Sequence, residues 1–80
     1  MQDTQQRRSF GEVRRRAFLP VRDLAEKAGV SSRTVMDIEH GRTAPQLRTI
    51  KKLAEALEVD PLTVEEFAAV IEGEPKKAAA

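Results

Sequence analysis

A short polar stretch near the middle of the chain has side chains whose types and spacing could form hydrogen bonds along one helical face. Ser31 is a good N-cap for a helix that runs to about residue 40, and Val35 and Ile38 fall on its inward face. The other face carries hydroxyl, guanidinium and carboxylate groups, which are able to bond the edges of DNA bases. The residues expected on that outward face are Ser32, Arg33, Met36, Asp37 and His40.

The residues before this helix supply the element that would position it. Residues 21–28 have an apolar stripe of helical period, and Gly29 follows where a tight turn needs a positive φ. Two short helices that cross on such a turn form a helix-turn-helix, which presents its second helix to a DNA major groove. A plain helical hairpin is the alternative. The combined pattern favours DNA binding, and it consists of Leu24, Ala25, Gly29, Val35 and Ile38.

The rest of the chain is predicted to add three more helices. Ser9 and Glu12 form a capping-box pattern at the start of a helix that runs to about residue 17. A fourth helix is expected over residues 46–57. Asp60 and Pro61 then form a cap followed by a first-turn proline, which predicts a fifth helix over residues 61–71. The expected fold is an all-α, compact five-helix bundle.

Both ends of the chain lack an apolar face of regular period. The predicted organisation is therefore a flexible N-terminal arm over residues 1–8, a single helix-turn-helix domain over residues 9–71 and a flexible C-terminal tail over residues 72–80.

Composition excludes several classes of protein. The 80 residues are 40% hydrophobic and 34% charged, and no apolar run approaches the roughly 20 residues of a membrane span. There is no cysteine, and the single histidine, His40, leaves no cluster for a metal. The sequence offers no phosphate-binding glycine loop and no nucleophile–base pair. We therefore expect a protein without enzymatic activity, cofactor or metal, located in the cytoplasm with the nucleoid, because no signal peptide is evident.

Charge is distributed unevenly along the chain. Residues 1–42 carry nine Arg or Lys against six Asp or Glu, whereas residues 43–80 carry five against seven, for a net charge of +1. Eight of the nine early cations are arginine, the side chain best shaped for phosphates and guanine edges. An ordinary solvated surface would have the same charge, so charge alone does not decide between such a surface and one that binds nucleic acid.

The segment DLAEKAGVSSRTVMDIEHGRTAP, followed by LRTIKKLAEALEVDP, resembles the phage-repressor/Cro-like helix-turn-helix family, often called XRE. The likeness covers about residues 10–67 and needs no gap. It implies a compact five-helix DNA-binding domain, usually a transcriptional repressor that acts as a dimer on a near-palindromic operator.

The resemblance also implies roles for particular residues. Ser32, Arg33 and Asp37 match base-contacting positions, and the outward Met36 is a further candidate, next to a thymine methyl or as a cover for the turn. The positions expected to contact phosphate are Thr34, Arg42 and Thr43, together with Arg48 and the backbone amides at the start of the fourth helix.

By the same resemblance, residues 32–40 form the recognition helix, and an ion pair is implied between the first helix and this one. Arg14 and Glu39 match a partly buried pair of the family. Their spacing agrees, because Arg14 follows the inward Val13 and Glu39 follows the inward Ile38.

The chain departs from the family pattern at the start of the second helix and within the third. Val21 stands where glutamine is common, and Pro20 replaces a Ser or Thr cap. Asp37 stands where a polar or basic residue is commoner. Its carboxylate either accepts from a cytosine amino group or holds Arg33, four residues earlier.

One recognition helix contacts only about four base pairs, which is too few to select one operator, so a homodimer is expected. Val70 and Ile71 are the candidate dimer surface. Two alternatives stay open: an antitoxin that neutralises a toxin partner through a second surface, and a protein-interaction module that no longer binds DNA.

Overall fold

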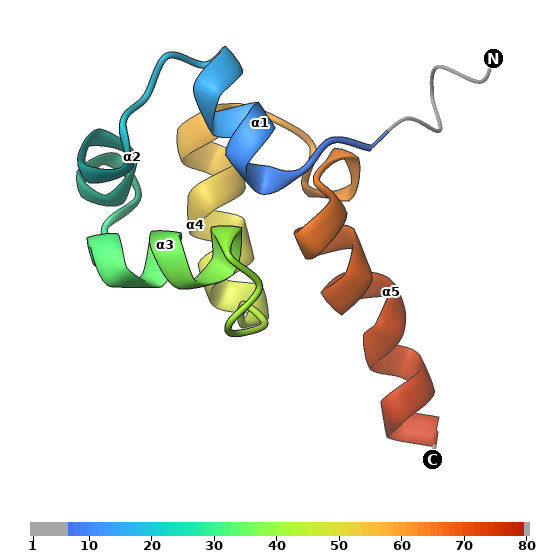
Figure 1. The fold of residues 1–80 in the computed structure, drawn as a ribbon. Helices are drawn as coiled ribbons and strands as arrows, with labels where there is room; N and C mark the ends of the chain where they lie inside the picture. The colour runs from blue at the N-terminus through green and yellow to red at the C-terminus, as the bar shows by residue number, and fades with distance from the viewer. Residues whose placement is uncertain (1–6, 80) are drawn as a thin grey trace, which may run out of the picture.

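The computed structural model describes the backbone of residues 7–79 and the side chains of residues 7–73. The fold is all-α. Figure 1 shows α1 and α3 lying across α4, with α2 on one side of the molecule and α5 on the other. The helices are α1 (Phe10–Arg16), α2 (Val21–Ala28), α3 (Ser32–Glu39), α4 (Leu47–Leu57) and α5 (Glu65–Ala79). In the described part of the chain, no helix has the length and apolarity needed to cross a membrane.

The core contains apolar side chains from all five helices. The rings of Phe10 and Phe67 pack with centroids 5.2 Å apart and planes tilted by 44°, which joins α1 to α5. The Phe10 amide also donates to the Glu66 carboxylate at 2.8 Å. The other large, fully buried side chains come from α2, α3, α4 and the residue before α5, and they are Leu24, Val35, Ile38, Leu53 and Val64.

The turn between α2 and α3 has the predicted left-handed residue. Gly29 has a φ of 76°, and its amide donates to the Ala25 carbonyl at 2.9 Å. A Cβ atom at Gly29 would meet nothing within 4 Å, so this position needs glycine for its backbone conformation rather than for space. Ala25 is 3% exposed beneath the crossing of the two helices.

The start of the fifth helix differs from the prediction. Asp60 does cap the chain, since its carboxylate accepts from the Leu62 amide at 2.9 Å, but the turn it starts is a 3-10 turn at Pro61–Thr63. Val64 is then extended, with φ −106° and ψ 121°, and α5 begins one residue later. The interruption allows the backbone on either side of Val64 to pair with Arg8 in a short parallel bridge.

The last two residues of the predicted flexible arm are held in place. The Arg8 amide donates to the Thr63 carbonyl at 3.0 Å, and the Arg8 carbonyl accepts from the Glu65 amide at 2.8 Å. The Arg7 guanidinium pairs with the Glu72 carboxylate at 2.7 Å. The other arm residues, 1–6, lie outside the described part of the chain.

The predicted end of the fifth helix at Ile71 is also corrected. The structure continues α5 to Ala79, through most of the segment expected to be a flexible tail, while residue 80 lies outside the described part. Glu72 is held by Arg7 across the bundle, and alanine, at positions 78 and 79, has the highest helix propensity of any residue.

Candidate nucleic-acid interface

The third helix is fixed at its N-terminus by a side-chain cap. The Ser31 hydroxyl accepts from the Thr34 amide at 3.0 Å and lies 2.9 Å from the Thr34 hydroxyl. Val35 and Ile38 are 0% and 1% exposed on the inward face. The cap and these two anchors set which face of α3 points to solvent.

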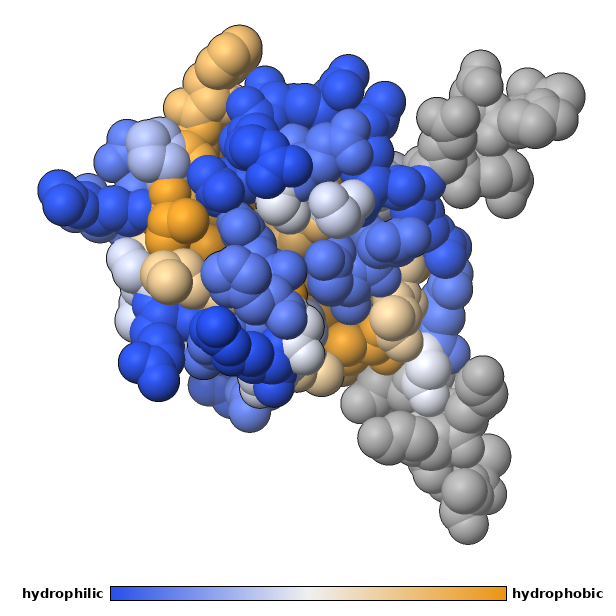
Figure 2. Space-filling model, in the orientation of Figure 1, coloured by the Kyte–Doolittle hydropathy of each residue, from blue (hydrophilic) through white to orange (hydrophobic). Residues whose placement is uncertain are grey.

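The outward face of α3 carries the predicted base-contacting residues. Positions 32, 33, 36 and 37 follow one another at helical spacing along one side. The Arg33 side chain is 83% exposed, Met36 is 39% exposed, and the surface over α3 is mostly hydrophilic in Figure 2. Ser32 is half-buried. The structure therefore brings together on one face, at least partly open to solvent, the residues Ser32, Arg33, Met36 and Asp37.

The Asp37 carboxylate lies between two arginines. One oxygen is 3.6 Å from the Arg33 Nε, and the other is 3.4 Å from the Arg42 Nη1. The Arg33 contact has the i,i+4 spacing that the sequence shows, whereas nothing in the sequence pattern indicated the Arg42 contact.

The Arg42 contact depends on how α3 ends. His40 is the C-cap, and Gly41 follows with a φ of 71°. This left-handed residue turns the chain back, so that the Arg42 amide donates to the Asp37 carbonyl at 2.8 Å. Backbone geometry thus places the Arg42 side chain beside the recognition helix.

The predicted phosphate-contacting residues surround α3 on the loop and the next helix. Arg42, Thr43 and Arg48 are exposed, and Thr34 is half-buried at the start of α3. The N-cap of α4, Gln46, makes no side-chain hydrogen bond to the first turn. The first-turn amides of α4 therefore have no side-chain cap, which is the arrangement that suits an anion.

Arg14 and Glu39 meet at the junction of α1 and α3. Arg14 donates through Nε to one Glu39 oxygen and through Nη2 to the other at 3.3 Å, and its Nη1 donates to the Leu19 carbonyl at 3.0 Å. The two side chains are only 14% and 12% exposed. This bidentate ion pair fixes the end of the recognition helix against the first helix.

Neither the N-cap of α2 nor its first residue has a polar side chain. Pro20 is the N-cap and makes no side-chain hydrogen bond, and Val21 is half-buried against the core. Within the described residues there is also no group of three or more metal-ligating side chains placed to hold an ion.

The comparisons agree with this geometry. A family model described as helix-turn-helix, the Cro/C1-type or XRE family, matches residues 12–64, which is more than half of the chain. Comparison with curated proteins gave no match, and neither did comparison with solved structures. The matched range contains all of α2, the turn at Gly29, α3 and α4. The chain belongs to the Cro/C1-type helix-turn-helix family of DNA-binding regulators.

Proposed function

We propose that this protein is a sequence-specific transcriptional repressor that binds the major groove with α3 and acts as a homodimer. The observation that carries the proposal is the exposed polar face of α3, which is held outward by the buried Val35 and Ile38. A DNA-bound regulator of this kind is located in the cytoplasm with the nucleoid and prevents transcription by occupying the site that polymerase needs.

The contacts divide into two kinds. Base edges are contacted from the outward face of α3, where Arg33 suits guanine and Met36 suits a thymine methyl. Phosphates are contacted by Thr34, Arg42, Thr43 and Arg48, with the first-turn amides of α4. The first kind gives sequence preference and the second gives affinity that depends on salt.

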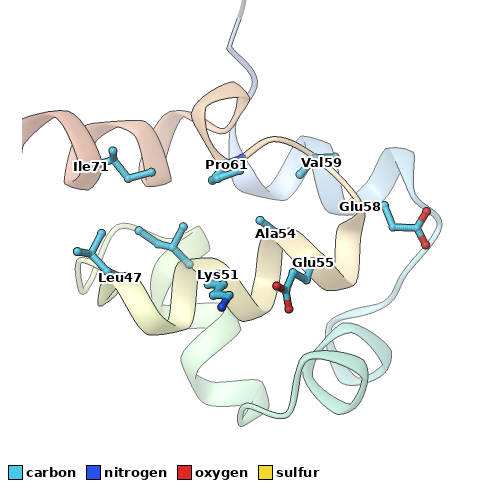
Figure 3. Close-up of a pocket in the computed structure, with 9 residues that line it drawn as sticks. Leu47, Lys51, Ala54, Glu55, Glu58, Val59, Pro61 and Ile71 are labelled. Atoms are coloured by element: carbon cyan, nitrogen blue, oxygen red, sulfur yellow. The ribbon is translucent and has the colours of Figure 1, made fainter.

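A second copy is required because one helix contacts only about four base pairs, with roughly 1–3 kcal/mol of discrimination for each good contact. We place the dimer surface at Val70 and Ile71, both half-buried against the core. Ile71 lines a groove of about 440 Å³ between α4 and α5, and in Figure 3 it lies at the same end of the groove as Leu47. Leu47 is 52% exposed, which supports apolar contact with another chain at this place.

A titration against random duplex DNA at two salt concentrations tests the proposed activity. Fluorescence anisotropy is expected to show binding at low salt that weakens steeply as salt rises. A protein-interaction module without DNA binding is the rival function, favoured by Val21 at the start of α2 and by the carboxylate of Asp37. Absence of binding at low salt would support that rival.

A further inference from the structure

We propose that Asp37 determines specificity by restraining both DNA-contacting arginines in the free protein and by opposing binding to unmatched DNA. This inference rests on the proposed function, since it concerns the same face of α3. Asp37 is the acidic side chain in the middle of a surface that is otherwise suited to a polyanion.

The geometry connects a base-contacting residue with a phosphate-contacting one. Each Asp37 oxygen faces a different guanidinium, Arg33 at 3.6 Å and Arg42 at 3.4 Å. The Asp37 side chain is 24% exposed, against 83% for Arg33 and 62% for Arg42. The carboxylate is thus the least exposed of the three charged groups, and each of the two longer side chains pairs with a different one of its oxygens.

Exposed ion pairs of this kind contribute only about 0–1 kcal/mol to folding, so the fold gains little from the arrangement. The charge of the Asp37 carboxylate has a larger effect on the affinity for DNA. A carboxylate beside the phosphate backbone removes about one unit of favourable charge from every non-specific complex.

A matched site removes this penalty. Guanine attracts the Arg33 guanidinium away from the carboxylate, phosphate attracts Arg42, and a cytosine amino group donates to the freed Asp37 oxygens. On other sequences Arg33 stays paired with the carboxylate and makes no base contact, and no cytosine amino group offsets the negative charge beside the phosphates. Asp37 therefore raises specificity by lowering the affinity for random DNA more than the affinity for the operator.

The substitution Asp37→Asn tests this, because asparagine keeps the shape and removes the charge. The matched control is Glu26→Gln, which removes the same charge from an exposed position on α2, a different helix that does not line the groove of the proposed dimer surface. Affinity is measured by fluorescence anisotropy at several salt concentrations for an operator selected from a random pool and for random duplex. Selection from the pool is repeated with each variant.

Asp37→Asn is expected to bind random duplex more tightly, to steepen its salt slope by about one unit and to lower the operator-to-random affinity ratio roughly fivefold. Base preference should relax at one position, and Glu26→Gln should leave the ratio and the preference unchanged. Adding Arg42→Ala to Asp37→Asn should cancel the gain on random duplex.

The inference is overturned if Asp37→Asn and Glu26→Gln change binding to random duplex equally, or if Asp37→Asn weakens both complexes alike. A second variant, Asp37→Ser, gives the same readout if asparagine introduces a new base contact. A wild-type protein that binds neither duplex at low salt contradicts the proposed function itself, which is a different result from equal behaviour of the two variants.

Discussion

Arg14 and Glu39 lie 25 positions apart in the sequence and form a bidentate ion pair between α1 and the last turn of α3. Each side chain is less than 15% exposed. The recognition helix therefore has charged as well as apolar contacts with the rest of the domain, and its orientation depends on a residue near the N-terminus.

Replacing Glu39 alone should destabilise the fold strongly. Glu39→Leu leaves the Arg14 guanidinium without its carboxylate in a poorly solvated place, which is expected to lower the free energy of unfolding by on the order of 3 kcal/mol. Urea denaturation measures this change. The double variant Arg14→Met, Glu39→Leu should recover most of the loss, because two apolar side chains leave no charge unpaired. A double variant as unstable as the single one would show that the stranded charge is not the cause.

The Ser31 cap should matter for both stability and DNA binding. Ser31→Ala removes the acceptor for the Thr34 amide and is expected to cost about 1 kcal/mol of stability. The matched control is Ser9→Ala, since Ser9 caps α1 in the same way by accepting from the Glu12 amide. Both variants should lose similar stability in urea, whereas only Ser31→Ala should weaken operator binding. Equal loss of binding in the two variants would contradict the assignment of α3 as the contacting helix.

Phe18 should be replaceable by glycine with a gain in stability. It is 89% exposed and has a φ of 59°, at the position after the C-cap of α1 where glycine is preferred. Phe18→Gly is expected to raise the thermal midpoint, because left-handed backbone costs an ordinary residue about 1 kcal/mol. Phe18→Ala keeps the strain and should change little. Gly29→Ala, at a φ of 76°, should have the opposite effect to Phe18→Gly.

The proposed dimer surface predicts a change of mass. Ile71→Lys is expected to shift the sedimentation mass at micromolar concentration from two chains to one, because a charge in the groove opposes apolar contact. Leu62→Lys is the control, since Leu62 is 41% exposed and does not line this groove. If the wild-type protein already sediments as one chain at that concentration, the dimer proposal is wrong.

The helix-turn-helix could be predicted from the sequence because its constraints are local. The apolar stripe of α2, the positive φ of Gly29 and the cap of Ser31 each follow from neighbouring residue types, and α2 has the predicted bounds. The five-helix, all-α fold was predicted for the same reason, since each helix has an apolar face of regular period.

Long-range backbone pairing could not be predicted in this way. The extended Val64 pairs with Arg8, and neither residue type indicates the bridge that delays α5 and holds the end of the expected arm. The predicted capping box forms only in part. The Ser9 hydroxyl accepts from the Glu12 amide, but the Glu12 carboxylate lies 3.4 Å from Arg8 and 3.5 Å from Arg16, because these long side chains are able to reach it from either direction.

The positions of the candidate residues on α3 could be predicted from the sequence, whereas their contacts with one another could be predicted only in part. Spacing gives the Arg33–Asp37 pair directly, because four residues make one turn of helix. The second partner of Asp37 depends on the left-handed turn at Gly41, which brings Arg42 back beside the helix. Positive φ at Phe18 and Glu58 was missed because neither residue is glycine.

We propose that α3 contacts bases while the loop after it contacts phosphates. The most direct measurement compares Arg33→Ala with Arg42→Ala on a selected operator and on random duplex across a range of salt. Arg33→Ala should relax preference at one base pair by roughly 1–3 kcal/mol, whereas Arg42→Ala should weaken both complexes alike and reduce the salt slope by about one unit. If both variants lower operator and random binding by the same factor with no change in base preference, the two residues do not have these separate roles.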